Sequence, residues 1–327
     1  MADELDGDAA RSTLSMKAWR VHNFGAPEAM RFETIDRPTP GPGEVLVKVR
    51  AAGVGPWDAW IRSGRSALPQ PLPLTLGSDL AGEVHEVGPG SVEFNAGDEI
   101  FGVTNKQFLG AYAEYAVACA SMLAKRPKSL TYVEAASVPV VAVTAWQALF
   151  EYARLGSGQR VLIHGAAGSV GSYAVQLAHA ANVNVVATAA SADMDYVRKL
   201  GAGEVIDYRN QRFEEHVREV DAVIDLVGGE TQTRSFDVLR RDGKMISTVS
   251  PPDQRLAKNY NVHAEFFLVE VTTERLTRIA ELLDRGKLKP EVGAVLPLSD
   301  ARNAHMMLDG GISRPRGKIV LSVDPPQ

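Results

Sequence analysis

The feature that most constrains this chain is a glycine turn between an apolar strand and a helix. The segment VLIHGAAGSVGSYAVQLA, residues 161–178, carries Gly165, Gly168 and Gly171 three residues apart, and a helix is expected from near Val170. In such a turn, backbone N–H groups approach a pyrophosphate, and the N-terminal end of the helix adds a favourable dipole. The turn therefore predicts a dinucleotide site. An ordinary tight turn between a strand and a helix is the alternative interpretation.

Strands and helices alternate around this turn. After Pro139 a helical stretch, TAWQALFEYARL, is followed by the strand-like segments QRVLIHG, NVNVVATA, EVIDY and DAVIDLVGG, with helical stretches between several of them. This alternation is typical of right-handed βαβ units, which build a parallel sheet with helices on both faces. We expect residues 139–270 to form a doubly wound α/β domain.

The residues before Pro139 have the pattern of a β-rich domain. Val45, Val47 and Val49 alternate with Lys48 and Arg50, which is the period of a half-buried strand, and further short strands are separated by Gly or Asp turns. We assign residues 16–138 to this domain, and we expect residues 271–327, which end in the strand GKIVLSV, to return to it. Residues 1–15 are polar and are expected to be a disordered extension. The 327 residues suit two domains of about 150 each.

Composition excludes several classes of partner. The chain has 35 basic and 40 acidic residues, a net charge of −5, so binding to nucleic acid is disfavoured. Its single cysteine, Cys119, makes neither an internal disulfide nor a four-cysteine zinc site, and we expect a cytoplasmic protein. No apolar run reaches the roughly 18 to 20 residues of a membrane helix, and the acidic start MADELDGD is unlike a signal peptide.

The end of the second strand of the parallel domain bears on which dinucleotide binds. An NAD site usually has Asp or Glu there, about 20 residues after the glycine turn, to bind the ribose 2′-hydroxyl. This chain has Ala189, Ala190 and Ser191 instead, and the missing acid favours NADP over NAD. No Arg or Lys follows at once, and Tyr208 with Arg209 comes after the third strand.

Several motifs, taken in order, resemble the zinc-independent quinone oxidoreductase branch of the medium-chain dehydrogenase/reductase superfamily. They are AAGVGPWDAWIRSG, LGSDLAGEVHEVGPG, AASVPVVAVTAW, the glycine turn, LGAGEVIDY, DLVGG and the terminal RGKIVL, and the resemblance runs from Met16 to Val323. It implies a GroES-like catalytic domain and a Rossmann domain that binds NADP. It also implies a homodimer joined through edge strands of the Rossmann sheets, for which NVHAEFFLVE is the candidate edge.

The same resemblance bears on zinc. Zinc-dependent relatives have Cys in the segment that holds Gly55, and His-Glu where this chain has Ser78 and Asp79. A zinc site needs three or four Cys, His or carboxylate ligands. The resemblance therefore implies a protein without catalytic zinc.

The resemblance also assigns the residues of the cofactor site. Thr144 matches the residue that bonds the nicotinamide carboxamide, and Ser191 and Tyr208 match the 2′-phosphate site. The remaining assigned positions are the pyrophosphate turn Gly165, Ala166, Ala167, Gly168, Ser169, Val170 and Gly171, then Val227, Gly228, Ser247, Val249, Phe266, Phe267 and Lys318. Relatives often have Asn where Gly55 stands, and a Lys shortly after the second strand, where this chain reads SADMD.

A site without zinc needs an acceptor that stabilises the charge of an incoming hydride by itself. Quinones and α,β-unsaturated carbonyls delocalise the added electron pair onto oxygen, and catalysis then depends chiefly on positioning. Trp57, Asp58 and Tyr112 are the candidate catalytic residues. The alternatives are that Asp58 caps the helix DAWIRSG, that Trp57 is a packing residue and that the Tyr112 hydroxyl lies at the surface.

The function that we predict is NADPH-dependent reduction of small quinones or enones. An enoyl thioester reductase, and a non-catalytic protein that binds or senses NADPH, remain alternatives.

Overall fold

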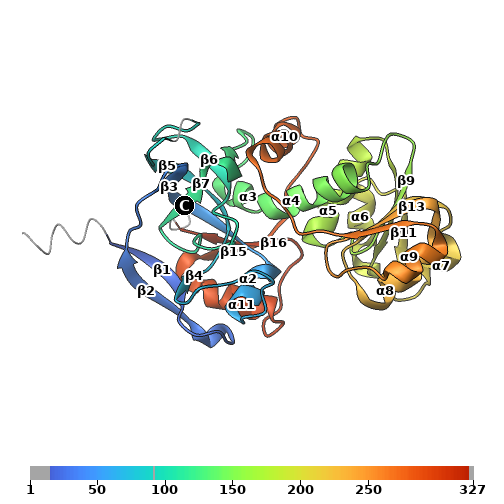
Figure 1. Ribbon diagram of the computed structural model, residues 1–327, viewed down its shortest axis with the longest axis horizontal. Helices are drawn as coiled ribbons and strands as arrows, with labels where there is room; N and C mark the ends of the chain where they lie inside the picture. The colour runs from blue at the N-terminus through green and yellow to red at the C-terminus, as the bar shows by residue number, and fades with distance from the viewer. Residues whose placement is uncertain (1–14, 91–92, 324–327) are drawn as a thin grey trace, which may run out of the picture. The chain divides into compact units, whose positions relative to one another are not determined.

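The structure is a computed structural model, and it describes residues 15–90 and 93–323. These form two compact units (Figure 1). Unit 1 contains the described residues up to Pro139, Val271–Asp284 and the chain from Pro290 onward, and unit 2 contains Val140–Glu270 and Arg285–Lys289. The short segment 285–289, which the sequence placed with the first domain, therefore clusters with unit 2. The expected extension lies outside the described residues except for Ser15, which is already part of a strand.

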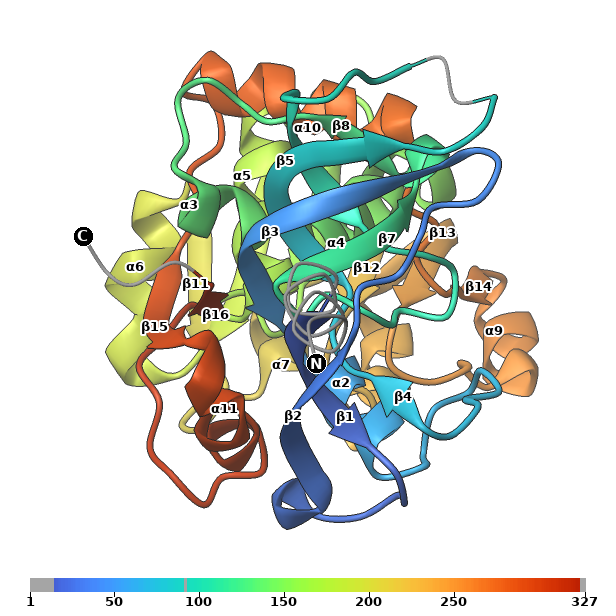
Figure 2. The ribbon, with the colours of Figure 1, turned by 90° about the vertical axis from the view of Figure 1, so that its left-hand side faces the viewer.

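Unit 1 is built on two sheets. A three-stranded sheet has the order β2-β1-β4, and a seven-stranded sheet has the order β15-β16-β3-β5-β6-β8, with β7 paired to β3. Figure 2 shows β3 crossing the larger sheet between β5 and β16. The strands are β1 (Ser15–Val21), β2 (Met30–Asp36), β3 (Glu44–Val54), β4 (Leu74–Thr75), β5 (Asp79–Val87), β6 (Glu99–Val103), β7 (Tyr115–Cys119), β8 (Leu123–Lys125), β15 (Val292–Pro297) and β16 (Lys318–Ser322).

The valines of β3 contribute to the hydrophobic core on one face of this sheet. Val45, Val47 and Val49 are buried, while Lys48 and Arg50 are half-buried, as the alternation predicts. β16, close to the C-terminus, pairs antiparallel with β3, so the last strand does join the first sheet. The helices of unit 1 are α2 (Pro56–Arg62), α3 (Tyr132–Ala136), α10 (Thr273–Asp284) and α11 (Ala301–Leu308), with 3-10 turns at Pro27–Ala29, Ala120–Met122 and Leu298–Asp300.

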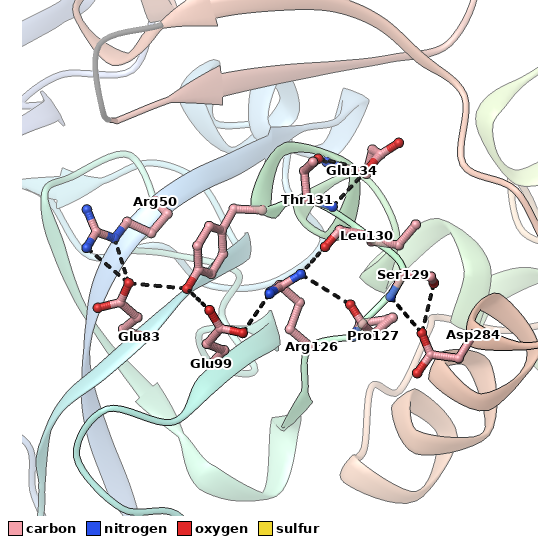
Figure 3. A network of polar contacts seen from close by, with 11 residues as sticks. Arg50, Glu83, Glu99, Arg126, Pro127, Ser129, Leu130, Thr131, Glu134 and Asp284 are labelled. Carbon is pink, nitrogen blue, oxygen red and sulfur yellow. Dashed lines mark hydrogen bonds and ion pairs between the residues drawn. The ribbon is translucent and has the colours of Figure 1, made fainter. Parts of the chain in front are cut away.

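A network of polar contacts ties α3 and the segment before it to this sheet and to α10 (Figure 3). The Tyr132 hydroxyl bonds the carboxylates of Glu83 (3.2 Å) and Glu99 (2.8 Å), on neighbouring strands β5 and β6. The Arg126 guanidinium also bonds Glu99, at 2.6 Å. Asp284, the last residue of α10, accepts from the backbone N–H and the hydroxyl of Ser129, at 2.9 and 2.8 Å. Residues more than 150 positions apart in the sequence are thereby joined in one unit.

Unit 2 contains a parallel sheet of six strands with the order β11-β10-β9-β12-β13-β14. Numbered along the chain, this is the order 3-2-1-4-5-6 of a Rossmann fold, with the switch point between β9 and β12. The doubly wound domain expected from the sequence is thus present. The strands are β9 (Arg160–Ile163), β10 (Asn184–Ala189), β11 (Glu204–Asp207), β12 (Val220–Asp225), β13 (Leu239–Ser247) and β14 (His263–Phe266).

The connections of unit 2 are mainly helical. They are α4 (Pro139–Trp146), a π-helical turn (Gln147–Tyr152), α5 (Ser169–Ala180), a 3-10 turn (Ser191–Asp193), α6 (Met194–Lys199), α7 (Phe213–His216), α8 (Gly229–Arg234), a 3-10 turn (Ser235–Val238) and α9 (Gln254–Tyr260). Leu162 and Val223 on adjacent strands are buried together with Phe236 in one core cluster. Across the described part of the chain, the structure has no helix long and apolar enough to span a membrane.

Candidate functional site

The first group of candidate residues lies in unit 1, where β3 ends and α2 begins. Gly55 is extended, and Pro56 starts the helix, where its missing N–H and fixed φ are favourable. Oδ2 of Asp58 accepts the Gly55 N–H at 2.8 Å. Asp58 therefore caps α2, which is the structural role that the sequence offered as an alternative to catalysis.

Asp58 and Tyr112 form a buried pair. The Tyr112 hydroxyl donates to Oδ2 of Asp58 at 3.0 Å, and both side chains are fully buried. Burial raises the pKa of Asp58 to about 7, against the smaller lowering effects of the Gly55 N–H and Lys318. Oδ1 of Asp58 has no hydrogen-bond partner among the described residues. The alternative that the Tyr112 hydroxyl lies at the surface is wrong.

The positions that zinc-dependent relatives use for ligands hold a different arrangement. The Lys318 ammonium lies 3.0 Å from Oδ2 of Asp79 and 4.2 Å from the centre of the Trp57 ring, and Lys318 and Asp79 are both buried. Nε1 of Trp57 donates to the Ser78 hydroxyl at 3.0 Å. We call Trp57, Ser78, Asp79 and Lys318 the lysine cluster.

These residues do not fit a zinc ion. Gly55 has no side chain, the Ser78 hydroxyl accepts from an indole, and the Asp79 carboxylate already faces a cation. A zinc site needs three or four ligands of suitable type. Within residues 15–90 and 93–323, no three His, Cys, Asp or Glu side chains lie together as a metal site would require.

The second group of candidate residues lies in unit 2, around the glycine turn. Gly165 has a φ of +69°, which favours glycine, and α5 begins at Ser169, one residue before the expected position. A Cβ on Gly171 would lie 2.2 Å from the Gly165 carbonyl oxygen. The glycine at this position therefore allows α5 to pack directly on the turn. The first N–H groups of a helix lack intrahelical partners, so this end of α5 is suited to an anion.

The loops that follow β9, β12 and β13 lie next to one another. A Cβ on Gly165 would lie 3.3 Å from Val227, and a Cβ on Gly228 would lie 3.2 Å from Val249. Val227 and Val249 are both about half exposed. The structure thus brings four of the predicted cofactor residues together at the carboxyl ends of the strands, where ligands of doubly wound sheets bind.

Asp225, at the end of β12, organises these loops and was missed in the sequence. Its Oδ1 accepts the N–H groups of Val227 (3.1 Å) and Gly228 (2.8 Å), and its Oδ2 accepts the Ser247 hydroxyl (2.8 Å). The carboxylate is fully buried, so these bonds compensate for its desolvation. The signal was available as an Asp that ends the apolar strand in VIDLVGG.

The predicted 2′-phosphate residues have an acidic neighbour. The exposed Ser191 hydroxyl donates to Oδ2 of Asp207, and Asn210 bonds the same oxygen at 2.6 Å. These bonds, with that of Ser191 first, lower the pKa of Asp207. Tyr208 is 55% exposed. The expectation that no acid stands beside Ser191 holds for β10 only, because pairing of β10 with β11 brings in Asp207 from the next strand.

The other predicted cofactor residues have these positions. Thr144 is buried in α4 and donates to the Val140 carbonyl at 2.7 Å. Phe266 ends β14 opposite Ser247 of β13, and Phe267 is buried with its ring stacked on Tyr152, the centroids 4.2 Å apart. Lys318, by contrast, belongs to unit 1 and to the lysine cluster.

Comparisons with known families agree with this architecture. Residues 41–128 match the alcohol dehydrogenase GroES-like domain, and residues 200–321 match the family described as zinc-binding dehydrogenase. The human mitochondrial NAD(P)H oxidoreductase RTN4IP1 is 33% identical, over 96% of this chain and 90% of the relative. Human quinone oxidoreductase is 32% identical, over 94% of this chain and 97% of the relative.

Solved structures show the same likeness. The quinone oxidoreductase from Coxiella burnetii has a TM-score of 0.88 at 33% identity, over 95% of this chain and all of that one. Mycobacterial Rv1454c complexed with NADPH has a TM-score of 0.83 at 30% identity, over 94% of this chain and 99% of that one. The likeness therefore extends over both units.

Proposed function

Because the chain belongs to the quinone oxidoreductase branch of the medium-chain dehydrogenase/reductase superfamily, we propose that it is an NADPH-dependent, zinc-independent reductase. Its acceptors are small quinones or α,β-unsaturated carbonyls. The oxidoreductase class follows from the family, whereas the cofactor, the acceptor and the independence from zinc are the proposal.

The observation that carries the proposal is the lysine cluster. In it, the Lys318 ammonium lies between an indole and the carboxylate of Asp79, and Ser78 and Asp79 are the positions at which the sequence resemblance places His and Glu in zinc-dependent relatives. Without a Lewis acid to polarise an alcohol or a simple carbonyl, the acceptor has to stabilise the added charge itself. Quinones and enones do so, since the electron pair of the hydride is delocalised onto their oxygen.

The dinucleotide, when bound, supplies the hydride. The N-terminal end of α5 is suited to its pyrophosphate, and the half-exposed Val227 and Val249 offer apolar surface beside the glycine turn. Asp225 holds the backbone of Val227 and Gly228 in place through two hydrogen bonds. Reduction of a quinone to a hydroquinone consumes one hydride, supplied by NADPH, and one proton from solvent, and it leaves NADP⁺.

Asp58 and Tyr112 act as positioning residues in this proposal. Both side chains are buried; Tyr112 donates to Asp58, and Asp58 in turn accepts the Gly55 N–H at the start of α2. Their bonds fix the orientation of the helix turn that carries Trp57. We assign protonation of the reduced acceptor to water, because delocalised oxygen anions of this kind need no strong acid.

In this proposal, Ser191 and Tyr208 favour NADPH by binding its 2′-phosphate, whereas the negative charge of Asp207 disfavours it. We expect Asp207→Asn to raise the preference for NADPH over NADH by about fivefold, because it removes one negative charge near the 2′-phosphate. The measurement is the ratio of kcat/KM for the two cofactors. Asp253→Asn, an exposed acid of unit 2 that caps α9, is the matched control. An unchanged ratio in Asp207→Asn would place the 2′-phosphate elsewhere.

Activity is tested by steady-state oxidation of NADPH with a panel of quinones and enones, including an enoyl thioester. The expected result is turnover with at least one quinone or enone, unaffected by a zinc chelator. A protein that binds NADPH, quenches its own fluorescence on binding and oxidises it with none of them would overturn the proposal in favour of a binding or sensing role. Turnover confined to the thioester would identify an enoyl thioester reductase.

A further inference from the structure

Unit 1 contains a cavity of about 410 Å³ that none of the assignments above uses. Its walls come from α2, from the segment just after α2, from the end of α11 and from the loop that leads to β16. α2 and α11 lie side by side in the fold, as Figure 1 also shows. The cavity therefore opens within one unit and needs no residue of the other.

One side of the cavity is apolar. Pro56, Ala59 and Leu308 line it together with Trp60, whose side chain is 49% exposed. An indole of this size is costly to leave in water, and its face is suited to stacking on a planar ring. Trp60 lies on the same helix as Trp57 of the lysine cluster, three residues or about one helical turn further along.

The other side of the cavity carries the charged side chains of Arg65, Asp309 and Arg314, and the charge of Asp309 is neutralised by an ion pair. Oδ2 of Asp309 accepts from Nη2 of Arg62 at 2.7 Å, and the Arg62 side chain is almost fully buried. Nη1 of Arg62 donates to Nδ1 of His305 at 2.9 Å, which requires a neutral imidazole. Burial first, and then Arg62, lower the pKa of His305 to about 3. Asp309 is therefore balanced by the Arg62 charge.

The two remaining cations lack a carboxylate partner. The Arg65 guanidinium bonds the Ser63 hydroxyl at 2.9 Å and has no ion pair among the described residues. For Arg314 the described chain offers neither a hydrogen bond nor an ion pair. Both side chains are exposed and line the cavity. Two guanidinium groups beside an exposed indole suit a planar molecule that carries an anion, since Arg binds carboxylate and phosphate in a planar fork.

We propose that this cavity binds a planar aromatic or quinonoid molecule through a carboxylate or phosphate group, with Trp60 against the ring and Arg65 and Arg314 on the anion. The proposal adds a substrate preference to the proposed reductase function. Only the identification of the bound ligand as the hydride acceptor rests on that function. It predicts that the enzyme selects anionic acceptors over their neutral parents.

Direct binding tests the cavity without turnover. Calorimetric titration of the whole chain would compare 2-naphthoate, 2-naphthyl phosphate and the neutral 2-naphthamide. We expect the better of the two anions to bind about tenfold or more tighter than the amide, and its identity distinguishes carboxylate from phosphate recognition. The double variant Arg65→Gln/Arg314→Gln should lose this difference. Arg255→Gln, which removes an exposed charge of unit 2, is the control and should keep it.

The proposal is overturned if amide and anions bind equally, or if the double variant keeps the preference. A second measurement separates it from the reductase function: KM for a carboxylated naphthoquinone and for its neutral parent. The double variant should raise KM about tenfold for the anionic acceptor only. Binding that depends on the two arginines, without reduction of any acceptor, would refute the reductase function and support the ligand site in the cavity. Reduction of acceptors, with the double variant changing KM equally for the anionic and the neutral acceptor, would support the reductase function and refute the ligand site.

Discussion

At the scale of single residues, the ion pair of Lys318 with Asp79 is the feature with the largest expected effect on stability. Both groups are buried, so removing one leaves an uncompensated charge in a poorly solvated place. We expect Lys318→Met to lower the free energy of unfolding by about 3–5 kcal/mol, measured by urea denaturation.

A matched variant at an exposed ion pair separates the effect of burial on stability from the effect of removing a positive charge. Lys125 pairs with Asp98 at the surface, so Lys125→Met should change stability by about 1 kcal/mol or less. Combining Lys318→Met with Asp79→Asn should recover part of the loss, because the unpaired carboxylate is then neutral. Equal effects of Lys318→Met and Lys125→Met would contradict the assignment of a buried pair.

His164 makes stability depend on pH. It follows β9, is buried, and bonds the hydroxyls of Thr188 (3.0 Å) and Ser235 (2.9 Å). Ser235 donates its own proton to the Thr231 carbonyl, so Nε2 of His164 is the donor and Nδ1 accepts from Thr188. Burial lowers the pKa of this imidazole to about 4, from an ordinary 6.5.

The sign of the pH effect follows from where the proton binds. Below about pH 6.5 the unfolded chain protonates His164 while the folded chain does not, so the stabilisation present above pH 6.5 is lost as the pH falls towards 4. The loss amounts to about 3 kcal/mol. Urea unfolding over this range should show a shallower pH dependence in His164→Gln than in the wild type. His263→Gln, at an exposed position, should keep the wild-type slope.

At the scale of elements, the contact between α5 and the glycine turn determines the backbone geometry of the proposed cofactor site. We expect Gly171→Ala to weaken NADPH binding by at least about tenfold, because its Cβ would meet the backbone of Gly165 and Ala166 at 2.2 and 2.7 Å and push the helix away. Fluorescence titration measures this affinity. Gly156→Ala, whose Cβ would have its nearest contact at 3.8 Å, is the control and should bind normally. Normal binding by Gly171→Ala would show that the turn does not carry the pyrophosphate.

The helices and strands also show which features the periodicity of the sequence predicts and which it does not. The sequence located the alternation of strands and helices and the start of α5 to within one residue, because both depend on local spacing. It overestimated the strand in NVHAEFFLVE, of which only His263–Phe266 is in the sheet. β14 has a partner on one side only, so its length is set by pairing with β13 rather than by its own apolar residues.

At the scale of the whole molecule, the edge position of β14 bears on assembly. β14 is the outermost strand of its sheet, as the sequence predicted, and the outer edge of such a strand can pair with another chain. We propose a homodimer joined there. Light scattering over a dilution series should give twice the 35.2 kDa of one chain. A single-chain mass at every concentration would contradict the dimer. A cytoplasmic location likewise stays a proposal, resting on cysteine content.

The sequence by itself determined the two-unit architecture, the Rossmann sheet and the place of the glycine turn, because strand alternation, helix period and glycine spacing are local properties of the chain. It also offered helix capping as the alternative to a catalytic role for Asp58, since capping involves residues three apart. The assigned roles of the cofactor residues stay predictions that the experiments above address.

Only the tertiary structure decided which distant residues meet. Lys318 contacts Asp79 because β16 pairs with β3 and β3 pairs with β5. The spacing of these residues along the chain does not predict this contact. Asp207 stands beside Ser191 because β10 and β11 are adjacent, and Arg62 meets Asp309 because α2 packs on α11. Periodicity tells which side of an element is buried, whereas charge pairing across elements depends on sheet order and helix packing, which the folded chain alone fixes.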